Sequence, residues 1–143
     1  MGINRTLERT PTMSNANVIF DHVHLISRNP ESTAAWYAEK LGGRVVNSSE
    51  VRGAPSIVVA FKGATVIIRG QRPGEKVGDK DGLENGLDHF GFRIEGDFDG
   101  FCGDLKKNGV KFTIDPMDFA PGVRIAFIEA PDAVSIELLQ RKG

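Results

Sequence analysis

The chain contains the same strand opening twice, and this internal repeat is the feature that most constrains its fold. The segment FDHVHL occupies residues 20–25, and the segment LDHFGF occupies residues 87–92. Each copy places a histidine, His22 or His89, directly after an aspartate, although the chain has only 3 histidines. The same order of predicted elements follows each copy: a strand, a helix and three more strands. We therefore expect two βαβββ halves that share one core.

Alternation and capping signals define the elements of the first half. Alternating apolar residues predict a strand over residues 18–27. Asn29 is a typical N-cap and Pro30 a typical first helical residue, so a helix begins here, and Gly42 ends it. Three further strands are predicted over residues 44–48, 56–61 and 64–69.

The second half repeats this order. A strand is predicted over residues 88–95 and a helix over residues 97–108. The end of the second half resembles the end of the first, and the two copies are aligned by matching Ala60-Phe61 to Ala126-Phe127. The remaining strands are predicted over residues 110–114, 123–129 and 134–139.

The composition along the chain predicts one domain with an N-terminal arm. Residues 1–17 are polar and without period, so they are interpreted as an arm, and residues 18–143 as a single domain. Within the domain, the modules span residues 18–69 and 86–140. The segment between them, residues 70–85, is rich in glycine and acidic residues, and we predict a flexible linker of the kind that often acts as a lid.

The overall charge excludes some partners. The formal net charge is −1 and hydrophobic residues make up 40% of the chain, which is typical of a soluble globular protein. We therefore expect no nucleic-acid or membrane partner and a cytoplasmic location. The single cysteine, Cys102, excludes an internal disulfide and is expected to be a small buried apolar side chain.

Strand parity places the histidines on one face of each half. Side chains alternate along a strand, so His22 and His24 share a face and the residues between them point toward the helix. In the second half His89, Gly91 and Arg93 share the corresponding face. If the halves are related by a pseudo-twofold axis, His22 and His89 approach each other in a cleft between the sheets.

Glu137 is a carboxylate within an apolar strand, and burying it is costly unless it is paired or bound to a metal. Two histidines and one carboxylate from different strands form a facial metal site with open positions, suited to divalent Fe, Mn, Co, Ni or Zn. The sequence therefore predicts His22, His89 and Glu137 as metal ligands. The alternatives are a surface or structural role for the histidines and an exposed Glu137 on an edge strand.

These residues resemble the vicinal oxygen chelate superfamily, which includes glyoxalase I, methylmalonyl-CoA epimerase, extradiol dioxygenases and bleomycin-resistance proteins. The resemblance covers about residues 18–140 and rests on three segments, FDHVHLISRNPESTAAWYAEKLGG, GLDHFGFRI and IAFIEAPDAVSIELL. It implies an α+β fold in which two βαβββ modules form an open, U-shaped mixed β-barrel. It also implies that His22, His89 and Glu137 bind a divalent metal, that a small substrate chelates this metal through neighbouring oxygens, and that the chain forms a homodimer.

Two departures from the family pattern separate the possible reactions. Glyoxalase I uses a second glutamate in the first module, and the internal repeat places Ile68 there, or Ile67 if the turn is shifted by one residue. Extradiol dioxygenases carry a tyrosine at the position of Phe127. The first hypothesis is a metal-dependent, glyoxalase-like lyase or isomerase acting on a small oxygenated metabolite. An Fe(II) or Mn(II) extradiol-type dioxygenase and a non-catalytic binding protein of the bleomycin-resistance type remain as alternatives.

The sequence also offers candidates for proton transfer and substrate contact. His24 and Glu50 are candidate catalytic acids or bases, with a structural role for His24 and a solvated turn for Glu50 as the alternatives. Arg93 is a candidate clamp for a substrate carboxylate or phosphate, with a surface salt bridge as the alternative. Phe127 is predicted to line the substrate site.

Overall fold

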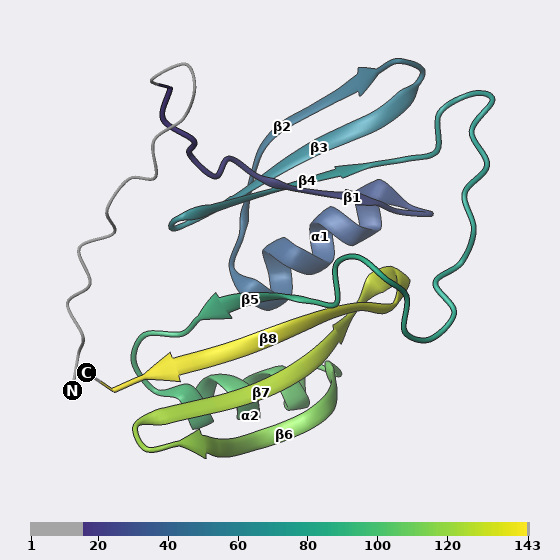
Figure 1. Ribbon diagram of the computed structural model, residues 1–143. Helices are drawn as coiled ribbons and strands as arrows, with labels where there is room; N and C mark the ends of the chain where they lie inside the picture. Colours follow the sequence, from purple (N-terminus) through teal and green to yellow (C-terminus); the bar gives the residue numbers. More distant parts are fainter. Residues whose placement is uncertain (1–15, 143) are drawn as a thin grey trace.

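The computed structural model describes residues 16–142, which form two modules with the same order of elements (Figure 1). The first module comprises β1 (Val23–Ile26), α1 (Pro30–Leu41), β2 (Arg44–Val51), β3 (Ala54–Phe61) and β4 (Ala64–Arg69). The second comprises β5 (Phe90–Arg93), α2 (Phe98–Lys107), β6 (Lys111–Ala120), β7 (Val123–Ala130), a short 3₁₀ turn (Pro131–Ala133) and β8 (Val134–Arg141).

Each module is a four-stranded mixed sheet with one helix. The strand order is β1-β4-β3-β2 in the first sheet and β5-β8-β7-β6 in the second. In both sheets the first strand runs parallel to the last, and all other pairs are antiparallel. A parallel pair requires a long crossover connection, which the helix and two intervening strands provide. The predicted fold class, two βαβββ modules of α+β type, is confirmed.

Local capping explains why the predicted helices form where they do. The side chain of Asn29 accepts a hydrogen bond from the Ser32 amide at 3.1 Å, and Pro30 occupies the first turn of α1. Gly42 ends α1 in the left-handed conformation, φ 75°, where a side chain would be strained. The side chain of Asp97 accepts from the Gly100 amide at 3.0 Å and begins α2 in the same way.

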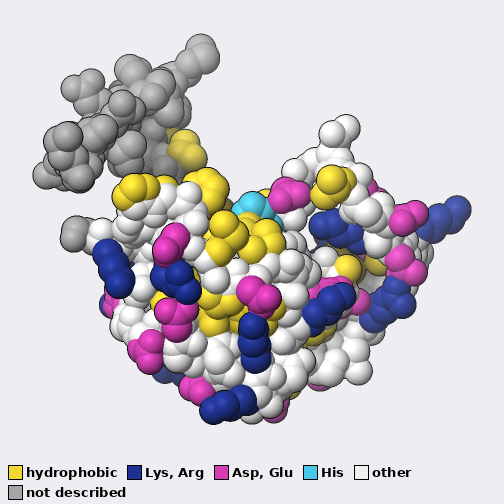
Figure 2. All heavy atoms as spheres, turned by 90° about the horizontal axis from the view of Figure 1, so that it is seen from below, with side chains coloured by type: hydrophobic (Ala, Val, Ile, Leu, Met, Phe, Trp, Pro, Cys, Tyr) yellow, Lys and Arg dark blue, Asp and Glu magenta, His cyan; other side chains and the backbone are white. Residues whose placement is uncertain are grey.

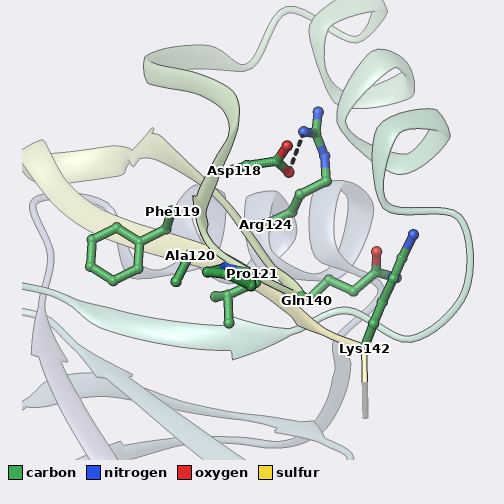
Figure 3. Close-up of a pocket in the computed structure, with 9 residues that line it drawn as sticks. Asp118, Phe119, Ala120, Pro121, Arg124, Gln140 and Lys142 are labelled. Atoms are coloured by element: carbon green, nitrogen blue, oxygen red, sulfur yellow. Dashed lines mark hydrogen bonds and ion pairs between the residues drawn. The ribbon is translucent and has the colours of Figure 1, made fainter.

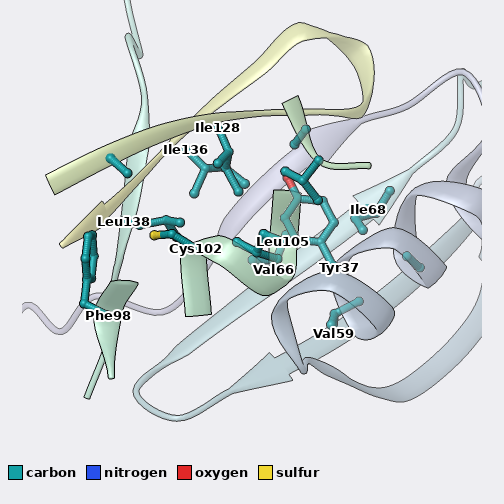
Figure 4. Close-up of a cluster of buried hydrophobic side chains, with 14 of the residues drawn as sticks. Tyr37, Val59, Val66, Ile68, Phe98, Cys102, Leu105, Ile128, Ile136 and Leu138 are labelled. Carbon is teal, nitrogen blue, oxygen red and sulfur yellow. The ribbon is translucent and has the colours of Figure 1, made fainter. Parts of the chain in front are cut away.

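The two modules share one hydrophobic core (Figure 4). Leu25 of β1 and Phe90 and Phe92 of β5 pack against it, so the predicted helix-facing positions of both strands are confirmed. Cys102 is 1% exposed, and burial raises the pKa of its thiol to about 11, as expected for a small apolar side chain. The largest fully buried side chains come from both modules: Tyr37, Val59, Val66, Ile68, Cys102, Ile128, Ile136 and Leu138.

Contacts between the modules hold them in one arrangement. The rings of Phe61 and Phe92, one from each module, lie 4.7 Å apart between centroids. At the ends of the two helices, Lys40 Nζ donates to the Asn108 carbonyl oxygen at 2.9 Å. The modules are therefore joined by apolar packing on the helix side of the sheets and by a polar bridge at the rim.

Several predicted boundaries differ from the structure. The predicted strand over residues 18–27 is shorter, Val23–Ile26, and the predicted strand over residues 110–114 extends to Ala120. The extension passes Pro116, which the edge strand β6 tolerates because it pairs on one side only and has register shifts there. Most of the predicted arm, residues 1–15, lies outside the described residues.

The predicted alignment of the two module ends is wrong. In the second sheet Phe127 pairs with Glu137, and in the first sheet the pair at the corresponding position is Val58 and Ile67. Phe127 therefore corresponds to Val58, and not to Phe61 as predicted. The difference arises because Phe61 is the last residue of β3, whereas Phe127 lies three residues before the end of β7, so the two Ala-Phe pairs occupy different places in their strands.

The segment after β4 begins with an ordered turn. Arg69 donates through both terminal nitrogens to the Glu75 carboxylate, at 2.6 and 3.2 Å. The same carboxylate accepts from the backbone amide of Arg72 at 2.7 Å. The start of the linker predicted to be flexible is thus tied to the sheet. Of the helices in the described part of the chain, none is long and apolar enough to cross a membrane.

Candidate functional site

The two repeated histidines are each oriented by the aspartate that precedes them. His22 Nδ1 lies 2.6 Å from an Asp21 carboxylate oxygen, and His89 Nδ1 lies 2.7 Å from an Asp88 carboxylate oxygen. His22 directly precedes β1, and His89 directly precedes β5. A carboxylate on Nδ1 fixes the ring and directs Nε2 away from the aspartate, which is the usual arrangement behind a metal-binding histidine.

The parallel pairing of β5 with β8 brings Glu137 to His89. Gly91 pairs with Glu137, and His89 lies two residues earlier on the same face. Glu137 Oε2 lies 3.3 Å from His89 Nε2. The ring of Phe127, whose residue pairs with Glu137 across β7 and β8, packs edge-on against His89 with centroids 4.9 Å apart. Glu137, His89 and the Phe127 ring therefore form one cluster.

Gly91 gives the Glu137 side chain its space. A Cβ atom at residue 91 would lie 3.3 Å from the Glu137 carbonyl oxygen and 3.8 Å from Glu137 Oε2. The first of these distances is tighter than ordinary contact, so a larger residue would press on the strand that carries the carboxylate. The glycine of LDHFGF thus accommodates the carboxylate, a role that its place in the motif did not reveal.

The two carboxylates around His89 stabilise its charged form. The hydrogen bond to Asp88 and the hydrogen bond and charge of Glu137 raise the pKa of His89, while burial opposes the change. A histidine held between two carboxylates marks a place of negative potential. Such a place favours a cation, either a proton or a metal ion.

His24 lies beside His22 on the first module, as parity predicts. The two ring centroids are 5.7 Å apart, and the rings meet edge to face. Burial lowers the pKa of His24, and electrostatic interactions with His22, Arg69 and Arg72 lower it further. His24 therefore favours the neutral form, which can accept a proton.

The predicted ligand set is only partly brought together in one chain. Among residues 16–142 no three side chains of histidine, cysteine, aspartate or glutamate gather closely enough to hold a metal ion. Glu137 and His89 are adjacent, and His22 is not part of their cluster. The side chains are of the types that bind a divalent ion, but within one chain His22 belongs to the first module and His89 and Glu137 to the second.

Glu50 and Arg93 lie apart from this cluster. Glu50 pairs with Pro55 on the edge strand β2, at the end of the sheet where β1 finishes, whereas His22 precedes the start of β1. Arg93 is on the predicted strand, but its side chain is 63% exposed and pairs with Glu95 at 3.6 Å. The structure therefore brings neither side chain to the two histidine dyads.

The register also identifies the first-module counterpart of Glu137. His24 pairs with Ile67 as Gly91 pairs with Glu137, so the counterpart is Ile67. Of the two positions predicted, Ile67 is the correct one, and Ile68 faces the core with no exposed surface. An isoleucine there can neither bind a metal nor transfer a proton.

One surface cleft lies next to the cluster of His89, Glu137 and Phe127. A cleft of ≈ 530 Å³ is lined by Asp88, His89 and residues of the segment between the modules. Figure 2 shows histidine side chains in a hollow between hydrophobic and charged side chains. A separate pocket of ≈ 310 Å³ lies at the β6–β7 turn, where Arg124 is already bound by Asp118 and Asp99 (Figure 3).

The described part of the chain consists of two βαβββ modules, each with an Asp-His dyad directly before its first strand. The family model for the Glyoxalase/Bleomycin resistance protein/Dioxygenase superfamily matches residues 19–138. The chain belongs to this superfamily. A search of curated proteins gave no match.

Solved structures share the fold at low sequence identity. A glyoxylase/bleomycin resistance protein/dioxygenase domain from Frankia sp. EAN1pec is 22% identical, with a TM-score of 0.75 over 89% of this chain and 94% of that one. A glyoxalase family protein from Bacillus cereus is 14% identical, with a TM-score of 0.78 over 93% and 100%. Glyoxalase I from Leishmania major is 18% identical, with a TM-score of 0.69 over 87% and 87%. At these identities the likeness establishes the fold.

Sequence reasoning did not assign a role to Asp21 and Asp88. Both aspartates were visible in the repeat, and the signal that could have identified them is their position directly before each histidine. Adjacent residues on a regular strand point to opposite faces, so a contact between them was not expected. It arises because both dyads lie before the regular strands begin.

Replacing Asp88 tests the electrostatics of the cluster. Asp88→Asn should lower the pKa of His89 toward its ordinary value, because the hydrogen bond to this carboxylate is the largest cause of the increase. The 3 histidines of the chain allow the ring resonances to be followed individually in an NMR pH titration. Asp21→Asn is the matched control and should leave the His89 titration unchanged; an unchanged His89 in Asp88→Asn would contradict the assignment.

Proposed function

We propose that the protein is a metal-dependent, glyoxalase-like lyase or isomerase that acts on a small oxygenated metabolite. The observation that carries the proposal is the repeated Asp-His dyad, in which each aspartate holds Nδ1 and leaves Nε2 available. Glu137 beside His89 adds the carboxylate that such a ligand set requires. Membership of the superfamily supports this class of function.

His22, His89 and Glu137 are the residues that would hold the ion. A bound divalent ion of Fe, Mn, Co, Ni or Zn would supply Lewis-acid polarisation of substrate oxygens. The protein's own contribution is to fix the imidazole rings through Asp21 and Asp88 and to seat the carboxylate beside Gly91. The aromatic ring of Phe127 would form an apolar wall for the substrate.

Proton transfer in this proposal falls to His24. Its lowered pKa favours the neutral base, and it lies on the same strand face as His22. Glu50 lies at the far end of the sheet and is not assigned a catalytic role here. Phe127 lies beside His89 at the position where extradiol dioxygenases carry a tyrosine, and it has no hydroxyl to donate a hydrogen bond to a substrate. This favours the isomerase or lyase reaction over cleavage of an aromatic ring.

A second copy of the chain is the proposed source of the missing ligand. In this homodimer, His22 of one protomer joins His89 and Glu137 of the other, so that each of two equivalent sites is completed across the interface. The proposal is supported by the separation of the ligands within one chain. It is also supported by exposed apolar side chains on the outer strands, including Val45, Val46, Ile114, Met117 and Phe119.

Metal content is the primary test of the proposal. After incubation with Mn(II), Co(II), Ni(II) or Zn(II) and desalting, the wild-type protein should retain about one ion per chain by elemental analysis. His22→Ala and Glu137→Ala should each lose most of it, because three protein ligands become two. Glu50→Ala is the control and should bind as the wild type does. Wild-type retention in both ligand variants would refute the site.

Complementation tests whether the site is shared between chains. His22→Ala and Glu137→Ala should each be defective, yet refolding an equal mixture should restore about a quarter of the wild-type metal content. Half of the random dimers are mixed, and each mixed dimer has one intact site. If the ligands instead meet within one chain, every site in the mixture carries a substitution and no metal binding returns.

Solvent exchange tests the reaction class. With the metal-loaded protein in D₂O, small 2-oxo and 2-hydroxy carbonyl compounds should exchange the hydrogen next to the carbonyl, followed by NMR. His24→Gln should abolish exchange while its metal content stays unchanged, because His24 is the proposed base and not a ligand. Oxygen consumption with catechol in the absence of exchange would instead identify the dioxygenase alternative.

A further inference from the structure

The two modules have diverged at the positions that face the candidate site. The register makes Ile67 the counterpart of Glu137 and His24 the counterpart of Gly91. By the same register Arg69, which pairs with Ile26, is the counterpart of Leu139, which pairs with Arg93. On this face the first module therefore has an isoleucine in place of the carboxylate and a histidine in place of the glycine, and among the positions compared the arginine lies on β4 in the first module and on β5 in the second.

Arg69 is held in place at the edge of this face. It lies two residues after Ile67 on β4 and diagonally across from His24 on β1, a distance that a long side chain can span. Its side chain is only 13% exposed and is engaged by both oxygens of Glu75. A partly buried, bidentate arginine–carboxylate pair restricts both side chains, so Arg69 is a positioning residue.

Arg72 is the cation that this arrangement leaves unused. The Glu75 carboxylate, held by Arg69, accepts a hydrogen bond from the backbone amide of Arg72. This bond fixes the position of Arg72 after the end of β4. Within residues 16–142 the Arg72 guanidinium has no ion pair or hydrogen bond, and its Nε is buried without a partner. A guanidinium without an acidic partner in the described part of the chain can pair with an anion from outside it through its terminal nitrogens.

We propose that Arg72, positioned by Glu75 and Arg69 after the end of β4, binds an oxyanion group of the substrate, a carboxylate or a phosphate. The guanidinium fork matches either group with two parallel hydrogen bonds. This inference rests on the proposed function and names its substrate class: an oxygenated metabolite that carries an acidic group. Arg93, the arginine predicted from sequence, is solvated and paired with Glu95, and it is the competing candidate.

Anion binding to the metal-free protein tests the proposal independently of the metal site. Malonate and inorganic phosphate are titrated separately at low ionic strength by calorimetry, with sodium chloride as the ionic-strength control. The wild-type protein should bind one equivalent of at least one of them, and the preferred anion distinguishes carboxylate from phosphate. Arg72→Gln should weaken this binding about tenfold or more, because a charge-assisted bidentate contact is lost.

Matched variants make the result specific. Arg44→Gln removes the same charge from the exposed strand β2 and should bind as the wild type does. Arg72→Lys keeps the charge but loses the fork, so it should bind with intermediate affinity. Unchanged far-UV circular dichroism and urea midpoint in Arg72→Gln establish that the fold is intact.

Three results would overturn the proposal: no saturable binding of either anion by the wild type, equal affinity in Arg72→Gln and Arg44→Gln, or a loss in Arg93→Gln that Arg72→Gln does not show. The metal content of Arg72→Gln should equal that of the wild type. If His22→Ala and Glu137→Ala retain metal while Arg72→Gln loses anion binding, the proposed function fails and the anion site stands.

Discussion

The parallel pairing of the first and last strand within each module is the constraint on which the candidate site depends. In the second module it sets Gly91 opposite Glu137 and so brings the carboxylate within 3.3 Å of His89. A parallel pair can form only when a long crossover returns the chain to the same edge, and the helix with its two following strands supplies that return. The packing of this helix is therefore what holds the two site residues, 48 positions apart in the chain, in contact.

The first module has the same strand pairing as the second but different side chains on the face away from the helix. Substitutions are tolerated on that face more readily than in the core. Ile67 and Glu137 occupy equivalent positions on the face away from the helix, whereas Ile68 and Leu138, one residue later, are fully buried in both modules. Residues on the helix side must preserve apolar volume to keep the shared core packed. Residues on the other side are free to diverge, and the modules differ there in charge.

The parts of the structure that depend on local chemistry could be predicted from the sequence. Asn29 and Gly42 delimit α1 because capping is decided within a few residues, and the alternation around His24 gives the correct face because strand parity is local. The register could not be predicted. The similar Ala-Phe pairs of β3 and β7 lie at different distances from the ends of their strands, which misaligned Phe127, and the choice between Ile67 and Ile68 required the strand pairs. The separation of His22 from the Glu137 cluster depends on how the modules pack, which no local pattern encodes.

The charged side chains of the two modules would constrain how the proposed substrate lies in the site. On the second module the carboxylates of Asp88 and Glu137 flank His89, so this side stabilises a cation and repels an acidic ligand. On the first module the Arg72 guanidinium has no acidic partner among residues 16–142 and would attract an acidic ligand. A molecule with an acidic group at one end and neutral oxygens at the other satisfies both sides in one orientation only, because reversing it would set like charges together. Both modules have the same strand order, and the few side chains in which they differ would set the orientation of the proposed substrate.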